Sequence, residues 1–150
     1  MKRLLYIILL MFALVCVLAS CQGEQGLQGD KGDAATNENP QGLDFYLQDD
    51  GTYAVEIGHA KLLSKVEIPA TYNGKSVTQI ISSIQANDKL VEIVIPDSVT
   101  LINHRAFNAC SNLKSIKYRG TESQWQEISK GVNWHPATEE YTITYNYTDE

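Results

Sequence analysis

The chain has few positive charges and few cysteines, and each shortage excludes a class of function. Twelve Lys and Arg residues stand against eighteen Asp and Glu residues, so the 150-residue chain has a formal net charge of −6. Non-specific binding to nucleic acid and docking on anionic lipid both need clustered cations, so we expect neither. The three cysteines are Cys16, Cys21 and Cys110. Because only Cys110 follows the first 21 residues, the remainder can form neither an internal disulfide nor a cysteine metal site.

The motifs of common catalytic sites are also missing. His59, His104 and His135 lie 45 and 31 residues apart, without the paired spacing of metal ligands. The sequence contains no nucleophile elbow, phosphate-binding loop or dinucleotide fingerprint. Residues 49–51, Asp-Asp-Gly, lack the later ligands of a calcium loop and are interpreted as a turn. We therefore expect no catalytic residue, no metal ion and no cofactor.

The first residues have the features of an export signal. Lys2 and Arg3 precede sixteen uncharged residues, from Leu4 to Ala19. Because a membrane-spanning helix needs about 18–20 apolar residues, this shorter run favours a signal peptide over residues 1–20. Two alternatives stay open, which are an uncleaved anchor and a secretory signal cut after Ala19.

The end of this leader resembles the lipobox of bacterial lipoproteins. Small residues precede a cysteine in the sequence Leu-Ala-Ser-Cys, residues 18–21. The resemblance implies that Cys21 is diacylated and becomes the first residue of the mature protein. Two or more acyl chains anchor a protein stably, whereas one does not. The resemblance therefore implies a lipid-anchored, surface-exposed protein of the bacterial cell envelope, bound to the membrane through Cys21.

Glycine then recurs at every third position. Four triplets of this kind, the period of collagen, occupy residues 23–34. Because the triplets are few and lack proline, we interpret residues 21–42 as a flexible, lipidated tether about 25 Å long. A small trimerising stalk is the alternative, so the oligomeric state stays open.

A repeated apolar pattern predicts one domain over residues 43–150. Three segments share the form L-x-x-Φ-x-Φ, where Φ is apolar, and they start at Leu63, Leu90 and Leu113. The first two continue with proline, then Val-Thr-x-Ile, then a short apolar cluster. Because a unit of this size cannot bury its own apolar side, the units are expected to stack into one column. The pattern predicts a short α/β leucine-rich-repeat solenoid of parallel strands and short helical turns, with Cys110 as an inert core residue.

At these residues the chain resembles the BspA-like leucine-rich-repeat proteins of bacterial surfaces. Residues 95–116, IPDSVTLINHRAFNACSNLKSI, match that family's repeat I-P-x-S-V-T-x-I-x-x-x-A-F-x-x-C-x-x-L. Residues 50–80 resemble its N-terminal unit, and residues 118–135 resemble its terminal segment. Ser83 and Asn87 depart from the family's usual Ala and Cys. The resemblance implies a solenoid fold and adhesion to host or neighbouring cells.

Both ends of the repeat array are expected to carry caps. Residues 45–48 and 53–57 predict a hairpin in which Gly51 supplies a positive φ. Residues 121–129 begin with a capping box, which predicts a short helix ended by Gly131. A final strand is predicted to close the open edge of the repeat sheet from the alternation of Tyr141, Ile143, Tyr145 and Tyr147. These aromatic side chains are interpreted as packing groups, with an exposed patch as the alternative.

The outward side of the repeat strands is the candidate binding site. Within each L-x-x-Φ-x-Φ segment the Φ positions point inward and the alternating residues point outward. The outward residues are Lys65, Glu67, Glu92, Val94, Ser115 and Lys117. Stacking sets them about 4.8 Å apart in two rows of mixed charge, a pattern suited to a specific protein surface. We therefore expect a protein or glycoprotein partner. A structural envelope lipoprotein without a foreign ligand and an accessory enzyme are the alternatives.

Overall fold

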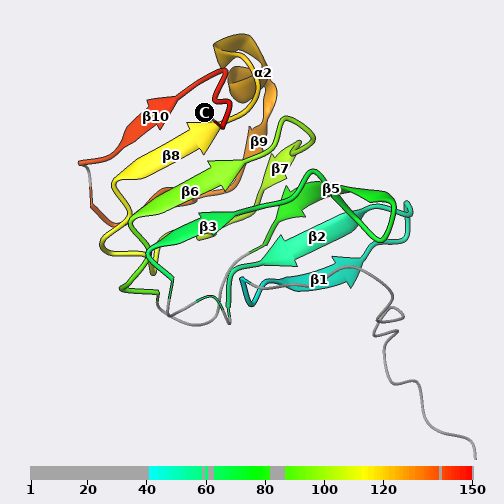
Figure 1. The fold of residues 1–150 in the computed structure, drawn as a ribbon, viewed down its shortest axis with the longest axis horizontal. Helices are drawn as coiled ribbons and strands as arrows, with labels where there is room; N and C mark the ends of the chain where they lie inside the picture. The colour runs from blue at the N-terminus through cyan, green and yellow to red at the C-terminus, as the bar shows by residue number, and fades with distance from the viewer. Residues whose placement is uncertain (1–40, 59, 61–62, 82–86, 139, 150) are drawn as a thin grey trace, which may run out of the picture. The chain divides into compact units, whose positions relative to one another are not determined.

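The repeat strands build two sheets from successive turns of the chain (Figure 1). The computed structural model describes residues 41–58, 60, 63–81, 87–138 and 140–149, which all belong to one compact unit. The elements in chain order are β1 (Asp44–Leu47), β2 (Tyr53–Glu56), β3 (Lys65–Glu67), β4 (Thr71–Tyr72), β5 (Lys75–Ile80), β6 (Glu92–Ile95), β7 (Leu101–Ile102), β8 (Ser115–Tyr118), α2 (Glu122–Glu127), β9 (Ser129–Lys130) and β10 (Thr142–Thr144).

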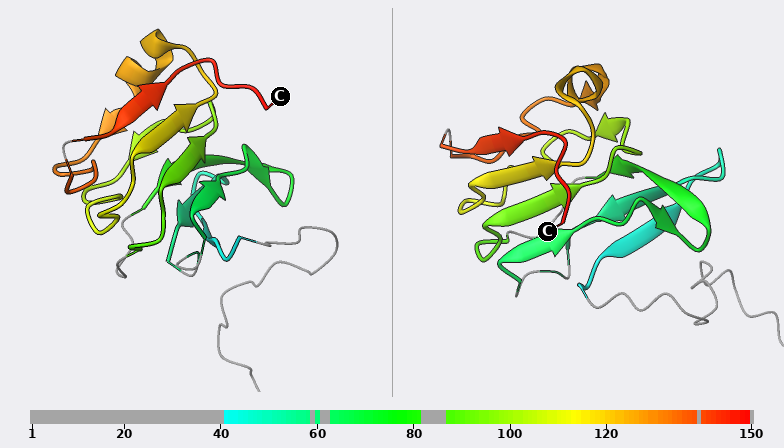
Figure 2. Two further views of the ribbon diagram at one scale, coloured as in Figure 1. Left: turned by 60° about the vertical axis from the view of Figure 1, so that its left-hand side comes forward. Right: turned by 45° about the horizontal axis from the view of Figure 1, so that its top comes forward.

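Beyond the first hairpin, the chain alternates between the two sheets. The parallel sheet has the order β10–β8–β6–β3, and all its strands run the same way. The mixed sheet has the order β1–β2–β5–β7–β9, with β1 and β4 antiparallel to their neighbours. Each turn of the chain therefore adds one strand to each sheet, and the result is a short β-solenoid (Figure 2). This arrangement confirms the coarse prediction of a short repeat solenoid.

The Φ residues of the three repeats form the predicted buried column. In the parallel sheet Val66 pairs with Ile93, and Ile93 pairs with Ile116. The exposed fraction of all three side chains is 0%. The leucines that open the second and third repeats, Leu90 and Leu113, are equally buried. Burial of these apolar side chains is the main term that holds the turns of the solenoid together.

The expected helical turns are not confirmed, and the Val-Thr-x-Ile segments contribute residues to a second sheet. The first contributes to β5 and the second leads into β7, where Ile80 pairs with Ile102 in the mixed sheet. Residues 104–109 form turns, and α2 is the one helix within the described ranges. Val, Thr and Ile are β-branched and favour the pleated, half-buried surface of a sheet, which explains this departure from the α/β expectation.

The two departures from the family pattern have different outcomes. Ser83 lies outside the described residues, whereas Asn87 occupies the position that Cys110 has in the next repeat. The buried Asn87 amide donates to the Ala60 carbonyl at 3.1 Å and accepts from the backbone N–H of Leu90 at 3.1 Å. Cys110 is also buried, and burial raises the pKa of its thiol to about 11. The column therefore accepts a polar side chain where its nitrogen and oxygen atoms both have hydrogen-bond partners.

The predicted elements at the two ends form with changed bounds. The β1–β2 hairpin closes through Gly51, whose φ is 82°. At α2 the Thr121 hydroxyl accepts from the Gln124 N–H, and the Gln124 side chain accepts from the Thr121 N–H. The helix ends at Glu127, before the predicted end, because the chain turns into β9. Gly131 has another role, since a Cβ there would lie 2.3 Å from the backbone nitrogen of His104.

The predicted C-terminal strand is shorter than the alternation of aromatic residues suggests. β10 covers only Thr142–Thr144, where it adds to the parallel sheet beside β8. Asn146 adopts a φ of 53°, a left-handed conformation that Asn tolerates and that ends the extended run. The following residues leave the plane of the sheet (Figure 2). We call residues 145–149 the strap.

The membrane-attachment predictions concern the beginning of the chain. Residues 1–20 and 21–40, which include Cys21 and the glycine triplets, lie outside the described residues. The domain boundaries, the signal peptide and the lipid anchor therefore stay predictions. In the part of the chain that the structure describes, no helix is long and apolar enough to cross a membrane.

Candidate functional site

The six predicted face residues lie on one side of the parallel sheet, which we call the outer face. One row of paired residues is Lys65, Glu92 and Ser115, and the other is Glu67, Val94 and Lys117. Both rows continue onto β10, where Thr142 pairs with Ser115 and Thr144 pairs with Lys117. The predicted register of the strands is confirmed, and binding at this face stays a prediction.

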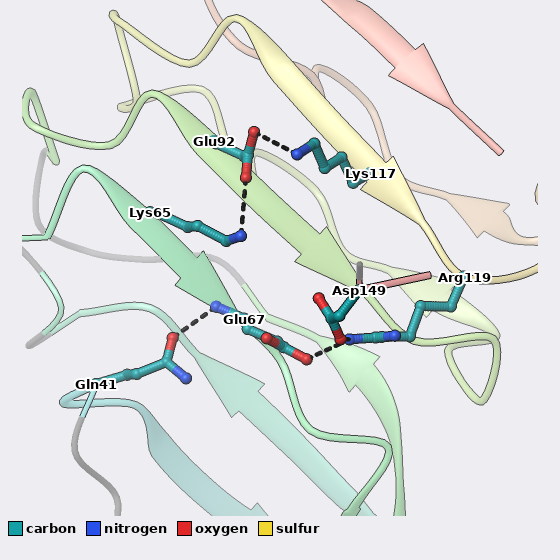
Figure 3. A network of polar contacts seen from close by, with 7 residues as sticks. All are labelled: Gln41, Lys65, Glu67, Glu92, Lys117, Arg119 and Asp149. Carbon is teal, nitrogen blue, oxygen red and sulfur yellow. Dashed lines mark hydrogen bonds and ion pairs between the residues drawn. The ribbon is translucent and has the colours of Figure 1, made fainter. Parts of the chain in front are cut away.

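A chain of ion pairs ties the outer face together across three strands (Figure 3). The Glu92 carboxylate lies 3.2 Å from Lys65 Nζ and 2.9 Å from Lys117 Nζ. Hydrogen bonding to Lys117 is the largest of the effects that lower the pKa of Glu92. The same contacts raise the pKa of both lysines. Glu92 therefore bridges the two lysines, and this group of three side chains keeps a net charge of +1.

Arg119 forms a second set of ion pairs, and the six predicted face residues do not include it. Its Nη2 atom lies 2.5 Å from Glu67 Oε1 and 2.5 Å from Asp149 Oδ2. Hydrogen bonding to Arg119 is the main cause that lowers the pKa of Asp149. Arg119 directly follows β8, two residues after Lys117, so continuing the alternation by one step would have found it. Asp149 had no such signal, because it belongs to the strap.

One residue of the predicted tether also reaches this site. The Gln41 side chain accepts a hydrogen bond from the backbone N–H of Glu67 at 2.5 Å (Figure 3). Glu67 lies in β3, which is an edge strand of the parallel sheet. Gln41 therefore satisfies a backbone donor that an edge strand otherwise leaves to solvent or to another chain.

Val94 differs from the prediction, because it points outward and is nevertheless fully buried. Its exposed fraction is 0%, whereas its row neighbours Glu67 and Lys117 are both partly exposed. The Tyr147 ring of the strap lies above this region, with its centroid 4.5 Å from Lys117 Nζ and 6.0 Å from Lys65 Nζ. We attribute the burial of Val94 to this ring. Part of the predicted open face is thus already covered by the chain itself.

The strap crosses the outer face near the carboxyl ends of the strands. The N–H groups of Asn146 and Tyr147 donate to the carbonyls of Gly120 at 2.8 Å and Tyr118 at 3.0 Å. Figure 2 shows the strap turning away from the end of β10 and passing over the neighbouring strands. At its end Asp149 pairs with Arg119, which also pairs with Glu67 of β3 (Figure 3). The strap therefore contacts cations from both β8 and β3.

The described residues were also compared with the requirements of a metal site. No group of three or more His, Cys, Asp or Glu residues in the described ranges could hold a metal ion. The Asp50 carboxylate accepts from the N–H and hydroxyl of Thr52 at 2.9 and 2.7 Å. Residues 49–51 therefore form the predicted turn, and hydrogen bonding to Thr52 lowers the pKa of Asp50.

The described residues fold into a short β-solenoid, and the paired rows of its parallel sheet form the outer face. No family model matches the chain, and no curated protein matches it. Among solved structures it is similar to a leucine rich cell surface protein from Faecalibacterium prausnitzii A2-165, with a TM-score of 0.52 and 22% sequence identity. The similarity covers 77% of this chain and 32% of that chain, so this chain spans about a third of that protein's length. The predicted resemblance to leucine-rich-repeat surface proteins is confirmed at the level of the fold.

Proposed function

We propose that this chain is a lipid-anchored protein of the bacterial cell envelope whose outer face binds a protein or glycoprotein partner, as in adhesion. The observation that carries the proposal is the register of the outer face, where cations and anions from successive strands stand in ordered rows. Such a fixed pattern of opposite charges favours one partner over others. The surface role of the Faecalibacterium protein with the same fold supports the proposed location.

The size of the face limits the affinity of a single copy. Four neighbouring strands, β10 included, make the outer face about 14 Å wide between its outer strands at the usual spacing of ~4.8 Å. A standard protein interface buries about 800 Å² on each partner, so this face supplies part of one. Many copies anchored on one membrane would bind by avidity and compensate for a modest affinity.

A charge-swap variant tests the proposed site. The variant carries Lys65→Glu, Glu92→Lys and Lys117→Glu. It keeps an opposite charge in both of these ion pairs and inverts the sign of every partner. The full chain, presented in many copies on lipid vesicles, would be assayed against extracellular-matrix proteins, mucins and bacterial envelope fractions. The matched control is Lys75→Glu, an exposed residue in the mixed sheet.

We expect saturable binding to at least one preparation, lost in the charge-swap variant and retained in the Lys75→Glu control. Equal binding by all three proteins would move the site away from the outer face. Absence of saturable binding by the folded wild-type chain would contradict the proposed function and favour a structural role in the envelope.

Lipid attachment has its own test. Cys21→Ala should abolish incorporation of labelled palmitate in a bacterial host, because the diacylated thiol is lost. Cys110→Ala is the matched control and should keep the label, since Cys110 is buried in the solenoid. Label that persists on the Cys21→Ala chain would refute the lipoprotein assignment.

A further inference from the structure

The strap contacts the outer face as a bound peptide would. Its backbone donates two hydrogen bonds, from Asn146 and Tyr147, to carbonyls at the end of β8. Its side chains contact the face itself. The Tyr147 ring makes cation–π contacts, and Asp149 forms an ion pair with Arg119. Backbone bonds combined with alternate side chains that make specific contacts are the recurrent means by which proteins recognise extended peptides.

The Tyr147 ring lies among three cations from two parts of the sheet. Its centroid is 4.5 Å from Lys117 Nζ, 5.7 Å from Arg119 Cζ and 6.0 Å from Lys65 Nζ. A cation within about 6 Å of an aromatic centroid is attracted by the electron-rich face of the ring. The three cations therefore form a receptor for an aromatic side chain. The fully buried Val94 is the strand partner of Lys117, one of these cations.

Besides an aromatic side chain, the charge of the outer face indicates a second group that a ligand would need. Without the strap, three cations (Lys65, Lys117 and Arg119) stand against two carboxylates (Glu67 and Glu92), so 3 − 2 leaves a charge of +1. Asp149 supplies the third carboxylate and brings this sum to zero. The face is thus cationic where the strap lies, although the whole chain has a net charge of −6. A ligand with an acidic group beside Arg119 would therefore balance the charge of the face.

The strap is held by contacts of a kind that a partner can replace. The Asp149 side chain is 56% exposed, and its ion pair with Arg119 is open to solvent. Exposed ion pairs contribute little to stability, and exposed cation–π contacts contribute modestly. A tethered segment still competes at a high effective concentration, so an external ligand binds in proportion to the fraction of chains whose strap is displaced.

We propose that the strap is an internal ligand of the outer face, and that the partner binds in its place through an extended peptide with an aromatic residue and, two residues later, a carboxylate. This inference rests on the proposed function of the outer face, and it adds the chemical class of the ligand. The strap occupies the contacts of the cations until such a peptide displaces it.

The test uses the full chain in detergent micelles and a fluorescent peptide with the sequence of residues 145–149, Tyr-Asn-Tyr-Thr-Asp. The strap-release variant carries Tyr147→Ala and Asp149→Ala. Peptide binding is measured by fluorescence anisotropy for the intact chain and for this variant. A second peptide carries the Tyr147→Ala change, and a third carries Asp149→Ala. Adding Arg119→Ala to the strap-release variant removes the receptor, and adding Lys75→Ala serves as the matched control.

We expect the strap-release variant to bind the unmodified peptide at least tenfold more tightly than the intact chain does. Arg119→Ala should remove this binding and Lys75→Ala should leave it unchanged, and both altered peptides should bind at least tenfold more weakly. A folded strap-release variant that does not bind the peptide would overturn the inference, as would equal binding by the intact chain. Concentration-dependent dimers of the intact chain, absent from the strap-release variant, would also overturn it, because the occupant would then be a second copy.

The peptide assay and the partner assay can fail separately. Peptide binding to the strap-release variant tests the receptor alone, without an envelope or matrix partner. If partners bind the intact and strap-release chains equally while the peptide binds neither, the inference fails and the proposed function stands. If the peptide binds but neither chain binds any partner, the proposed function fails.

Discussion

The two sides of the parallel sheet are built from the same strands and have opposite properties. On the inner side Val66, Ile93 and Ile116 are fully buried in the core. On the outer side, charged residues alternate with them and pair across the strands at partly exposed positions. Burial of a large apolar side chain contributes about 1.5–3 kcal/mol, whereas an exposed ion pair contributes about 0–1 kcal/mol. The inner side therefore fixes the fold, and the outer side is free to vary its contacts.

The largest expected effect comes from comparing adjacent residues of β6. Ile93→Ala should reduce the free energy of unfolding by about 2–5 kcal/mol, because it leaves a cavity in the centre of the column. Glu92→Ala, one residue earlier and on the outer side, should cost less than about 1 kcal/mol. Chemical denaturation of both variants measures the difference. Similar losses in the two variants would show that the outer ion pairs hold the fold as much as the core does.

An intermediate effect is expected at Val94, which lies on the outer side but is as fully buried as the inner residues. Val94→Ala should cost about 1–2 kcal/mol in the intact chain, since a fully buried valine loses apolar contact. In a Tyr147→Ala background the same change should cost less than about 0.5 kcal/mol, because the covering ring is gone. A double-mutant cycle from denaturant unfolding gives the coupling between the two side chains. Additive losses would show that another group buries Val94.

Most of the parallel sheet was predictable, because the side that each residue faces follows from the alternation within a short segment. The alternation in L-x-x-Φ-x-Φ assigns each side chain to a side, and the repeat spacing then sets the register that places Lys65 beside Glu92. The second sheet also has a signal in the sequence, but the expectation of one strand in each repeat left no place for it. Val-Thr-x-Ile is rich in β-branched residues, and its last residue pairs between repeats as Ile80 with Ile102.

The strap could not be predicted from the same rules. The alternation of Tyr145 and Tyr147 continues that of β10, so the pattern indicates a longer strand. One left-handed residue, Asn146, overrides it and directs Tyr147 onto the outer face. Asp149 then meets Arg119, thirty residues away in the sequence. Contacts at such separations depend on the path of the backbone, and a single asparagine does not reveal that path from sequence alone.

The smallest effect expected is a pH-dependent loosening of the strap. Arg119 lowers the pKa of Asp149, so this contact is complete above the pKa of an unfolded aspartate, about 3.9, and is lost as the pH falls through the lowered value. The Tyr147 ring signals in NMR spectra should therefore stay constant above about pH 5 and shift only in more acidic solution. The surrounding charges (Lys65, Glu67, Glu92, Lys117 and Arg119) include Glu92, whose pKa is also lowered and whose protonation would contribute to the shift.

Asp149→Asn separates the contribution of the strap from that of Glu92. In this variant the part of the acid-induced shift that comes from Asp149 should disappear, and the Tyr147 ring should be less firmly docked already at neutral pH. Asp50 provides an internal standard, because hydrogen bonding to Thr52 in the β1–β2 turn lowers its pKa independently of the strap. Its titration should be the same in both chains. An unchanged Tyr147 profile in the Asp149→Asn chain would mean that the aromatic contact alone holds the strap, and that the outer face selects its ligand by the ring and not by the carboxylate.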